Sequence, residues 1–217
     1  RSAVSIARRL QDPLAELVKI DPKAVGVGQY QHDVSQKRLA EQLDFVVETA
    51  VNQVGVDVNT ASPQLLQHIS GLNKTTAQNI VIYREENGEF TARTQLKKVP
   101  RLGPKAYEQA IGFLRVPGGK NILDNTGIHP ESYSIAKEIL TSVQLSEKEL
   151  GTEEAVEKLT RLSVEKLAES LSVGEETLTD ILAGLTQPGR DMRDEMPAPL
   201  LRTDVLSMED LKPGMEL

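Results

Sequence analysis

The sequence predicts a mainly α-helical fold, and three observations carry this prediction. A short pattern of apolar residues occurs twice between Val56 and Val116, thirty positions apart. Apolar residues in the flanking segments recur at the spacing of amphipathic helices. Several helix starts are marked by a polar residue followed by proline, or by glutamate three residues later. The expected architecture is a duplicated helical unit followed by a second, smaller helical unit.

The two copies of the repeat share their apolar positions and differ at most exposed ones. Leu72 of the first copy aligns with Leu102 of the second, for example. Each copy is interrupted by a glycine-containing tetrapeptide, 70–73 in the first and 100–103 in the second. Glycine in such a turn can take a positive φ and lets another backbone come close. Each copy is therefore predicted to form a helix, a tight turn and a second helix.

Both turns lead into a helix N-terminus, which is a favourable place for an anion. The first N–H groups of a helix lack intrahelical acceptors, and the positive end of the helix dipole adds to their attraction. Basic residues stand beside both turns, so phosphate is the obvious anion. The candidate binding residues are Gly71, Leu72, Asn73, Lys74, Thr75, Arg101, Leu102, Gly103 and Lys105. The alternative for Lys74, Arg101 and Lys105 is that they are ordinary solvated surface residues.

The turns resemble the helix-hairpin-helix family of nucleic-acid-binding motifs, whose turn usually reads apolar-Pro-Gly-apolar-Gly. The first turn keeps the first glycine as Gly71 and has Asn73 at the second. The second turn keeps Pro100 and Gly103 but has Arg101 at the first glycine. Asparagine tolerates the left-handed region better than most residues, so Asn73 is a mild departure from the motif. Arg101 is expected to replace a backbone contact by a charged side chain.

Longer segments resemble the Tex family of bacterial transcription accessory proteins. They are residues 26–34, 58–62, 83–90 and 124–133. The resemblance implies a chain cut from the middle of a protein with a YqgF domain of ribonuclease-H-like fold, tandem hairpins, a helical wedge and a C-terminal OB-fold RNA-binding domain. It also implies nucleic acid, either DNA or RNA, and the transcription machinery as partners.

The resemblance and the shifts in composition divide the chain into five segments. Residues 1–34 would be the tail of the YqgF domain, 35–55 a connecting helix, and 56–120 the tandem helix-hairpin-helix domain. Residues 121–186 would form an acidic, wedge-like helical subdomain. Residues 187–217 would be a linker and the start of an OB-fold domain, so the chain is expected to be a fragment.

Local signals also predict individual elements before the repeat. Residues 2–19 have helical spacing, and Pro13 either kinks this helix or follows Asp12 as the start of a second one. Residues 25–28 are expected to form a strand end. A long helix is predicted over 35–54, capped by its first residue and stopped by the glycine that follows.

Serine and glutamate at capping-box spacing predict two helix starts in the acidic segment. These pairs are Ser146 with Glu149 and Ser172 with Glu175. The turn at 172–175 also has the look of a third hairpin, but acidic residues occupy the place where a phosphate would sit. That segment is therefore expected to serve as an interaction surface or a spacer.

The net charge of −7 hides a strong asymmetry along the chain. Residues 1–55 carry seven basic and seven acidic side chains, 56–120 carry nine and five, and 121–217 carry nine and twenty. The net charges are therefore 0, +4 and −11. Attraction to phosphates supplies most sequence-independent affinity, so the basic excess at the hairpins favours nucleic-acid binding. An ordinary solvated surface explains a charge of +4 equally well.

Composition limits the chemistry that the chain can perform. Without cysteine there are no disulfides and no thiolate metal sites. His32 and Asp33 are expected to make turn contacts, because one carboxylate does not make a two-metal nuclease site. No other catalytic constellation is evident, and no apolar run has membrane-spanning length. We therefore expect a cytoplasmic protein that is not an enzyme and has no cofactor, metal, membrane partner or small-molecule substrate.

Two classes of function remain open at this point. The leading hypothesis is sequence-independent binding of the nucleic-acid phosphate backbone through the two hairpins. The alternative is a protein-interaction scaffold in which degenerate hairpins pack on neighbouring domains. Aromatic residues make up only 3% of the chain and tryptophan is absent, so a base-stacking platform for single strands is disfavoured.

Overall fold

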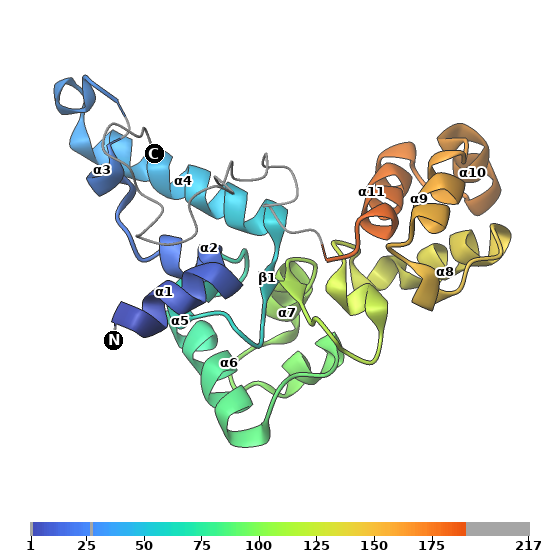
Figure 1. Cartoon of the computed structure of the whole chain (residues 1–217), viewed down its shortest axis with the longest axis horizontal. Helices are drawn as coiled ribbons and strands as arrows, with labels where there is room; N and C mark the ends of the chain where they lie inside the picture. Colours follow the sequence, from blue (N-terminus) through green and yellow to red (C-terminus); the bar gives the residue numbers. More distant parts are fainter. Residues whose placement is uncertain (1, 27, 190–217) are drawn as a thin grey trace, which may run out of the picture.

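In the described part of the chain, helices and 3-10 turns form the regular structure, apart from two strands of two residues each (Figure 1). The computed structural model describes residues 2–26 and 28–189. This architecture confirms the predicted mainly α-helical fold. Of the segment predicted as a linker and OB-fold start, residues 190–217 lie outside the described part of the chain. The boundaries of the five segments remain a prediction.

Short helices open the chain, and aspartate followed by proline starts two of them. They are α1 (Ser2–Gln11), α2 (Pro13–Leu17) and α3 (Pro22–Val25). The Asp12 carboxylate accepts a hydrogen bond from the Ala15 N–H at 3.2 Å. Asp12 therefore caps a second helix, which decides between the two alternatives at Pro13. Val25, predicted to lie in a strand end at 25–28, instead ends a helical turn that an Asp21 cap begins, whereas residue 27 lies outside the described residues.

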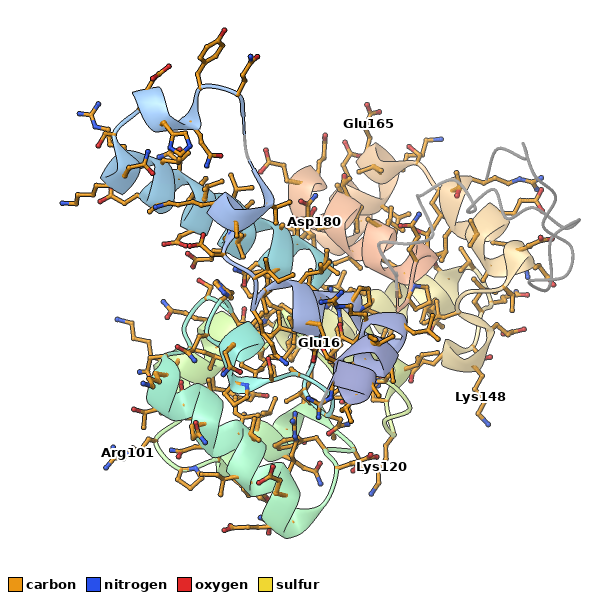
Figure 2. The ribbon with its side chains drawn as sticks, turned by 60° about the vertical axis from the view of Figure 1, so that its left-hand side comes forward. Glu16, Arg101, Lys120, Lys148, Glu165 and Asp180 are labelled. Carbon is orange, nitrogen blue, oxygen red and sulfur yellow. The ribbon has the colours of Figure 1, made fainter. Side chains whose placement is uncertain are left out.

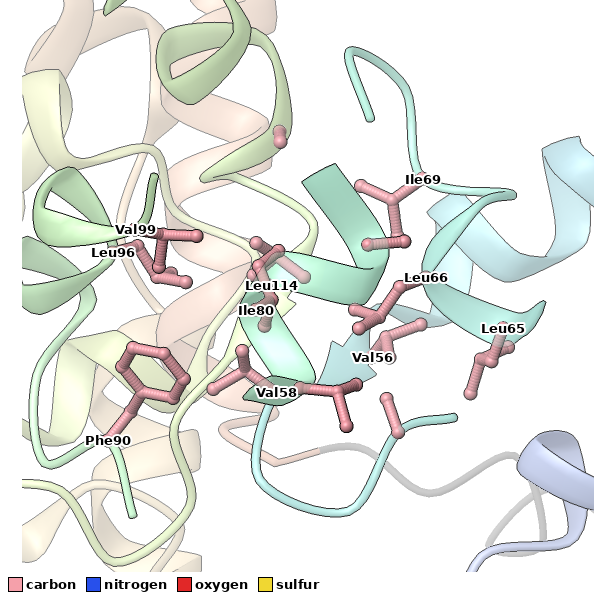
Figure 3. Packing of buried hydrophobic residues seen from close by; sticks show 14 of the residues in the cluster. Val56, Val58, Leu65, Leu66, Ile69, Ile80, Phe90, Leu96, Val99 and Leu114 are labelled. Atoms are coloured by element: carbon pink, nitrogen blue, oxygen red, sulfur yellow. The ribbon is translucent and has the colours of Figure 1, made fainter. Parts of the chain in front are cut away.

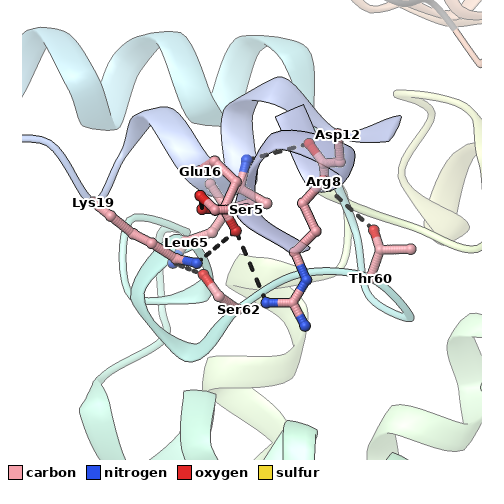
Figure 4. Close-up of polar contacts among 9 residues, drawn as sticks. Ser5, Arg8, Asp12, Glu16, Lys19, Thr60, Ser62 and Leu65 are labelled. Carbon is pink, nitrogen blue, oxygen red and sulfur yellow. Dashed lines mark hydrogen bonds and ion pairs between the residues drawn. The ribbon is translucent and has the colours of Figure 1, made fainter. Parts of the chain in front are cut away.

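Glu16 joins α2 to α1 (Figure 4). Its carboxylate accepts hydrogen bonds from the Ser5 hydroxyl and the Lys19 ammonium, both at 2.7 Å. The bond from Lys19, followed by that from Ser5, lowers the pKa of Glu16 below its usual value. The Asp12 carboxylate in turn accepts from the Thr60 hydroxyl at 3.3 Å, which ties α2 to the segment before the first hairpin.

The long helix α4 (Gln36–Val54) follows the 3-10 turn η1 (Gln31–Asp33). Ser35 occupies its N-cap position, and Gly55, with φ +81°, ends it as predicted. The Ser35 side chain makes no capping hydrogen bond, however. In Figure 1 the helix runs from the N-terminal helices to the start of the hairpins.

The two predicted hairpins form one unit whose beginning and end pair as parallel strands. The elements are β1 (Val56–Asp57), α5 (Pro63–Leu66), α6 (Lys74–Asn87), η2 (Arg93–Lys98), α7 (Pro104–Ala110) and β2 (Leu114–Arg115). Val56 is in register with Leu114, and this pairing closes the unit. The first helix of the second hairpin is a 3-10 helix, η2, rather than the expected α-helix.

The aligned apolar positions of the two hairpins meet in one core (Figure 3). Leu66 and its counterpart Leu96 are both fully buried, and Ile69 and Val99 expose 1% and 3% of their surface. Burial of each such side chain stabilises the fold by roughly 1.5 to 3 kcal/mol. The repeat in the sequence is therefore a repeat in packing, in which each hairpin completes the core of the other.

The turn of each hairpin packs on the second helix of the other hairpin. A Cβ built on Gly71, in the first turn, would lie 2.7 Å from Cβ of Gln109 on α7. The Asn79 amide on α6 donates a hydrogen bond to the backbone oxygen of Pro100, in the second turn, at 2.7 Å. Asn79 and Gln109 are thirty positions apart, which is the spacing of the repeat. The two contacts are thus counterparts in a pseudo-twofold arrangement.

A second core lies in the helices that follow. The elements are η3 (Ile122–Asn125), η4 (Pro130–Ser132), α8 (Tyr133–Ser142), η5 (Glu147–Glu149), α9 (Glu153–Thr160), α10 (Val164–Leu171) and α11 (Glu175–Thr186). The capping box between Ser146 and Glu149 is confirmed, with the Ser146 N–H donating to the carboxylate at 2.7 Å. The capping box predicted at Ser172 is wrong, because Ser172 ends α10 in a left-handed conformation and Gly174 precedes α11.

A buried arginine joins the two cores. Arg93 is 1% exposed, and its backbone N–H donates to the Asp124 carboxylate at 3.0 Å. Its guanidinium donates to the carbonyl oxygens of Leu114, Ile128 and Thr126 and to the Tyr133 hydroxyl, at 2.5 to 2.8 Å. The Tyr133 hydroxyl donates in turn to Asp124 at 2.7 Å. A buried charge needs this degree of pairing, and the network fixes the hairpin unit to the start of the next one.

The packing at Gly71 gives a direct test of the hairpin arrangement. We expect Gly71→Ala to lower the free energy of unfolding by about 2 kcal/mol or more, because alanine disfavours φ +85° and its methyl would meet α7. The matched control is Gly103→Ala in the other turn, where φ is −68° and no atom lies within 4 Å of the added carbon. Chemical denaturation should show a much smaller loss for the control. Equal losses would contradict the packing described here.

Candidate nucleic-acid interface

The two hairpin turns follow the same backbone path. Each begins with a residue of positive φ, Gly71 at +85° and Arg101 at +64°. A leucine packed on the core comes next, and an extended residue then caps the second helix. Asn73 is this capping residue, and with φ −130° it does not use its tolerance of the left-handed region. The left-handed position is the one that Arg101 occupies in the second copy.

The first turn satisfies its own N–H groups. The Asn73 side-chain oxygen accepts hydrogen bonds from the backbone N–H groups of Thr75 and Thr76, both at 3.0 Å. The Thr76 hydroxyl accepts from the Asn73 N–H at 2.8 Å, which completes a capping box. Three donors that an anion would use therefore already have acceptors. Lys74 and the side chain of Thr75 are exposed beside this turn.

The second turn is open by comparison. Gly103 caps α7 without a side chain, and Pro104 occupies the first helical position, where it has no N–H. The N–H groups of Gly103 and Lys105 have no acceptor among the described residues. Arg101, Gly103 and Lys105 are all exposed. The open turn therefore combines free donors with two cationic side chains.

The nine basic residues of the hairpin segment do not all reach solvent. Arg93 is buried, and Arg84 donates to the Val58 carbonyl at 2.7 Å. Arg115 donates to the carbonyl oxygens of Gly112 and Thr126, and burial, followed by repulsion from Arg93, lowers its pKa to about 10. The six that remain exposed are Lys74, Lys97, Lys98, Arg101, Lys105 and Lys120. Figure 2 shows Arg101 and Lys120 pointing away from the ribbon of the hairpin unit.

Three other predicted site residues, Gly71, Leu72 and Leu102, pack against the interior of the hairpin unit. Leu102 is 7% exposed and Leu72 packs against the same core, so their side chains anchor the turns. Gly71 faces α7, as described above. A ligand could meet these three residues only through their backbone atoms. Whether any predicted site residue binds nucleic acid remains a prediction.

Two later turns repeat the backbone path without the positive charge. Gln144 and Ser172 have φ of +53° and +54°, each is followed by an apolar residue, and an extended residue then starts the next helix. Glutamates occupy the first positions of those helices, Glu147 and Glu175, where the hairpins have Lys74 and Pro104. Acidic residues at helix N-termini are favourable for the helix itself. The hairpin geometry thus extends into the acidic unit, whereas the basic surroundings do not.

One cluster of ionisable side chains was not apparent from the sequence. Glu108, His129 and Glu131 lie together between α7 and η4. Glu108 is twenty-one positions before His129, so only the fold brings them together. The spacing of His129 and Glu131 alone would not have indicated a site.

In the part of the chain that the structure describes, no helix is long and apolar enough to cross a membrane.

Comparisons with known families agree with this geometry. Residues 51–115 match the family described as a helix-hairpin-helix motif. Residues 121–193 match a family described as an HHH domain, which supports a hairpin fold for the acidic unit as well.

Proteins similar to the chain over its whole length come from bacteria and from animals. It is 64% identical over 217 residues to the Bacillus subtilis protein YdcI. It is 54% identical over 220 residues to the transcriptional accessory protein Tex of Neisseria gonorrhoeae, and 42% identical over 270 residues to the human S1 RNA-binding domain-containing protein 1. The chain spans 30%, 28% and 27% of the length of these three relatives, respectively. The chain thus has two matched hairpin regions, and from end to end it is similar to one segment of the transcriptional accessory protein Tex.

Proposed function

We propose that the tandem hairpins bind the phosphate backbone of nucleic acid without reading its sequence, and that the second hairpin provides the main contact. The observation that carries this proposal is the open turn at 101–105. Its free N–H groups at Gly103 and Lys105 lie beside the exposed side chains of Arg101 and Lys105. Backbone N–H groups and cationic side chains are typical partners of phosphate oxygens.

The first hairpin plays a secondary part in this proposal. Its N–H groups at Asn73, Thr75 and Thr76 would have to give up existing hydrogen bonds to meet a phosphate. Giving up an intramolecular hydrogen bond typically costs about 0.5 to 1.5 kcal/mol, which reduces the benefit of each new contact. Lys74 can still attract a phosphate as an exposed charge.

The conformation of Arg101 supports a functional role for its side chain. A residue with a Cβ in the left-handed region costs roughly 1 to 2 kcal/mol relative to the right-handed form. Glycine would remove this cost, as it does at the equivalent Gly71. Arg101 is exposed and makes no side-chain hydrogen bond or ion pair among the described residues, so no fold-stabilising contact offsets the strain. A contact between the Arg101 side chain and a phosphate would offset this strain.

The contacts proposed here carry no base information. They would join main-chain donors and basic side chains to phosphates, which are alike at every position of DNA or RNA. The names of the relatives refer to transcription in one case and to RNA binding in another. We therefore infer a non-enzymatic nucleic-acid-binding module, without cofactor or small-molecule substrate, that works with the transcription machinery in the cytoplasm.

A scaffold role is a second candidate, and it is favoured by the first hairpin. Gly71 presses on α7 and Asn73 closes its own turn, so this copy contributes packing more plainly than binding. The acidic unit, whose turns carry Glu147 and Glu175, would then face a basic protein partner. In this case the exposed cations would not influence affinity for nucleic acid.

Reversal of charge at the turns distinguishes the two candidates. We expect the combined change of Lys74, Arg101 and Lys105 to Glu to weaken binding to duplexes of unrelated sequence alike. The slope of log K against log salt should flatten by about 0.9 for each phosphate that the variant no longer neutralises. The control changes Lys137, Lys148 and Lys166 of the acidic unit to Glu, with the same change in charge. Unaltered affinity and salt slope in a folded turn variant would favour the scaffold.

Single substitutions test which hairpin provides the main contact. Lys74 and Lys105 both lie in the first turn of the second helix of their hairpins. We expect Lys105→Gln and Arg101→Gly each to flatten the salt dependence by about 0.9 on duplex DNA, and Lys74→Gln to have a smaller effect. Arg101→Gly should also raise the melting temperature, because it relieves the left-handed strain. A larger effect at Lys74 than at Lys105 would show that the first hairpin is the main contact.

A further inference from the structure

Three side chains with metal-binding atoms meet at the junction of the two units. Glu108 lies on α7, whereas His129 and Glu131 flank Pro130 at the start of η4. One ligand atom from each lies within 4.8 Å of those of the other two. We propose that these residues bind a divalent transition-metal cation of the Zn²⁺ class. This site would be separate from the phosphate contacts proposed above.

The imidazole of His129 is oriented for ligation through Nδ1. Nε2 lies 3.0 Å from the backbone oxygen of Glu108, which places its N–H to donate there. Metal-ligating histidines usually donate their other ring N–H in this way, because the bond fixes the tautomer and the ring orientation. Nδ1 accepts one long hydrogen bond, 3.3 Å, from the N–H of Glu131. A cation at Nδ1 would replace this bond and leave the backbone N–H of Glu131, an exposed residue, to water.

A positive charge between the carboxylates of Glu108 and Glu131 would be stabilised by both. Glu131 Oε2 lies 3.7 Å from Nδ1, and Glu108 Oε2 lies 3.7 Å from Nε2. Within the described part of the chain, neither glutamate pairs with a lysine or an arginine. Two adjacent carboxylates repel each other. A divalent cation would compensate both.

The distances are within reach of a real coordination sphere. Zinc ligands lie about 2.0 to 2.2 Å from the metal, so ligand atoms are separated by roughly 3 to 3.5 Å. The side chains of Glu108 and Glu131 are 50% and 80% exposed and can rotate to close the remaining gap. Three protein ligands would leave a position for water.

The donor set selects the class of metal. One imidazole nitrogen and two carboxylates suit Zn²⁺ and neighbouring transition metals, whereas Mg²⁺ and Ca²⁺ prefer oxygen alone. Because the ligands come from α7 and from η4, a bound cation would join the hairpin unit to the acidic unit. It would reinforce the junction that Arg93 already makes in the interior.

Calorimetric titration of the whole chain with ZnCl₂ near neutral pH tests this proposal. We expect one saturable site, and a rise in melting temperature on addition of Zn²⁺. Glu108→Gln and Glu131→Gln should each weaken Zn²⁺ binding by about tenfold or more. His129→Asn should abolish the site, while asparagine still caps the helical turn by accepting from the N–H of Glu131. His32→Asn, distant in the sequence and exposed, is the matched control and should bind as the parent does.

Three results of this titration would overturn the proposal. Absence of saturable binding below millimolar Zn²⁺ would do so, as would unchanged affinity in His129→Asn or tighter binding of Mg²⁺ than of Zn²⁺. The two glutamine variants alter exposed groups, so circular dichroism should confirm that they fold. If His129→Asn fails to fold, those two variants decide the matter. Nucleic-acid affinity measured in parallel should stay unchanged in all three, which separates this site from the proposed function.

Discussion

A backbone reversal through the left-handed region is the constraint on which the hairpin unit depends. At Gly71 and at Arg101 the chain turns between two helices, with φ of +85° and +64°. The reversal brings a leucine down onto the shared core and leaves the next residue extended at the head of a helix. It also presses each turn against the second helix of the other hairpin. Core, turn geometry and exposed helix start are therefore consequences of one conformation.

The same reversal produces different surfaces because the residues around it differ. Asn73 and Thr76 close the first turn with hydrogen bonds, whereas Gly103 and Pro104 leave the second one open. Gln144 and Ser172 continue the geometry into an acidic setting. The repeated fold thus gives one turn whose N–H groups are already hydrogen-bonded and one turn suited to anions. The other two turns lie among acidic residues. The different roles proposed for the first and second turns therefore depend on side chains at three or four positions.

Much of the fold was predictable from local patterns. The thirty-residue repeat identified the hairpins because packing against a shared core selects the same apolar positions twice, as Leu66 and Leu96 show. Asp12 and Glu149 act as their cap signals predicted, since a cap depends on three or four neighbouring residues. The helical turn at Pro22 and the cap at Gly174 were missed. Near Pro22, residues 25–28 suggested a strand end. Near Gly174, Ser172 and Glu175 have the spacing of a capping box.

What depends on the tertiary structure could not be read from the sequence. Arg93 counted toward a basic surface, yet it is buried in a network of carbonyl oxygens that come from twenty-one or more residues away. The cluster of Glu108, His129 and Glu131 exists only because α7 meets η4. The difference between the two turns was hidden as well. Asn73 was interpreted as a tolerant substitute for glycine, whereas its side chain occupies the donors that a phosphate would need.

Contact between phosphate and the free N–H groups of the second turn can be measured by NMR. As a short duplex is added at low and moderate salt, we expect large shifts of the amide proton and nitrogen signals of Gly103 and Lys105. We expect small shifts at Thr75 and Thr76, and the same pattern for an unrelated duplex sequence. Shifts concentrated at Thr75 and Thr76, or in the acidic helices, would contradict the proposed contact.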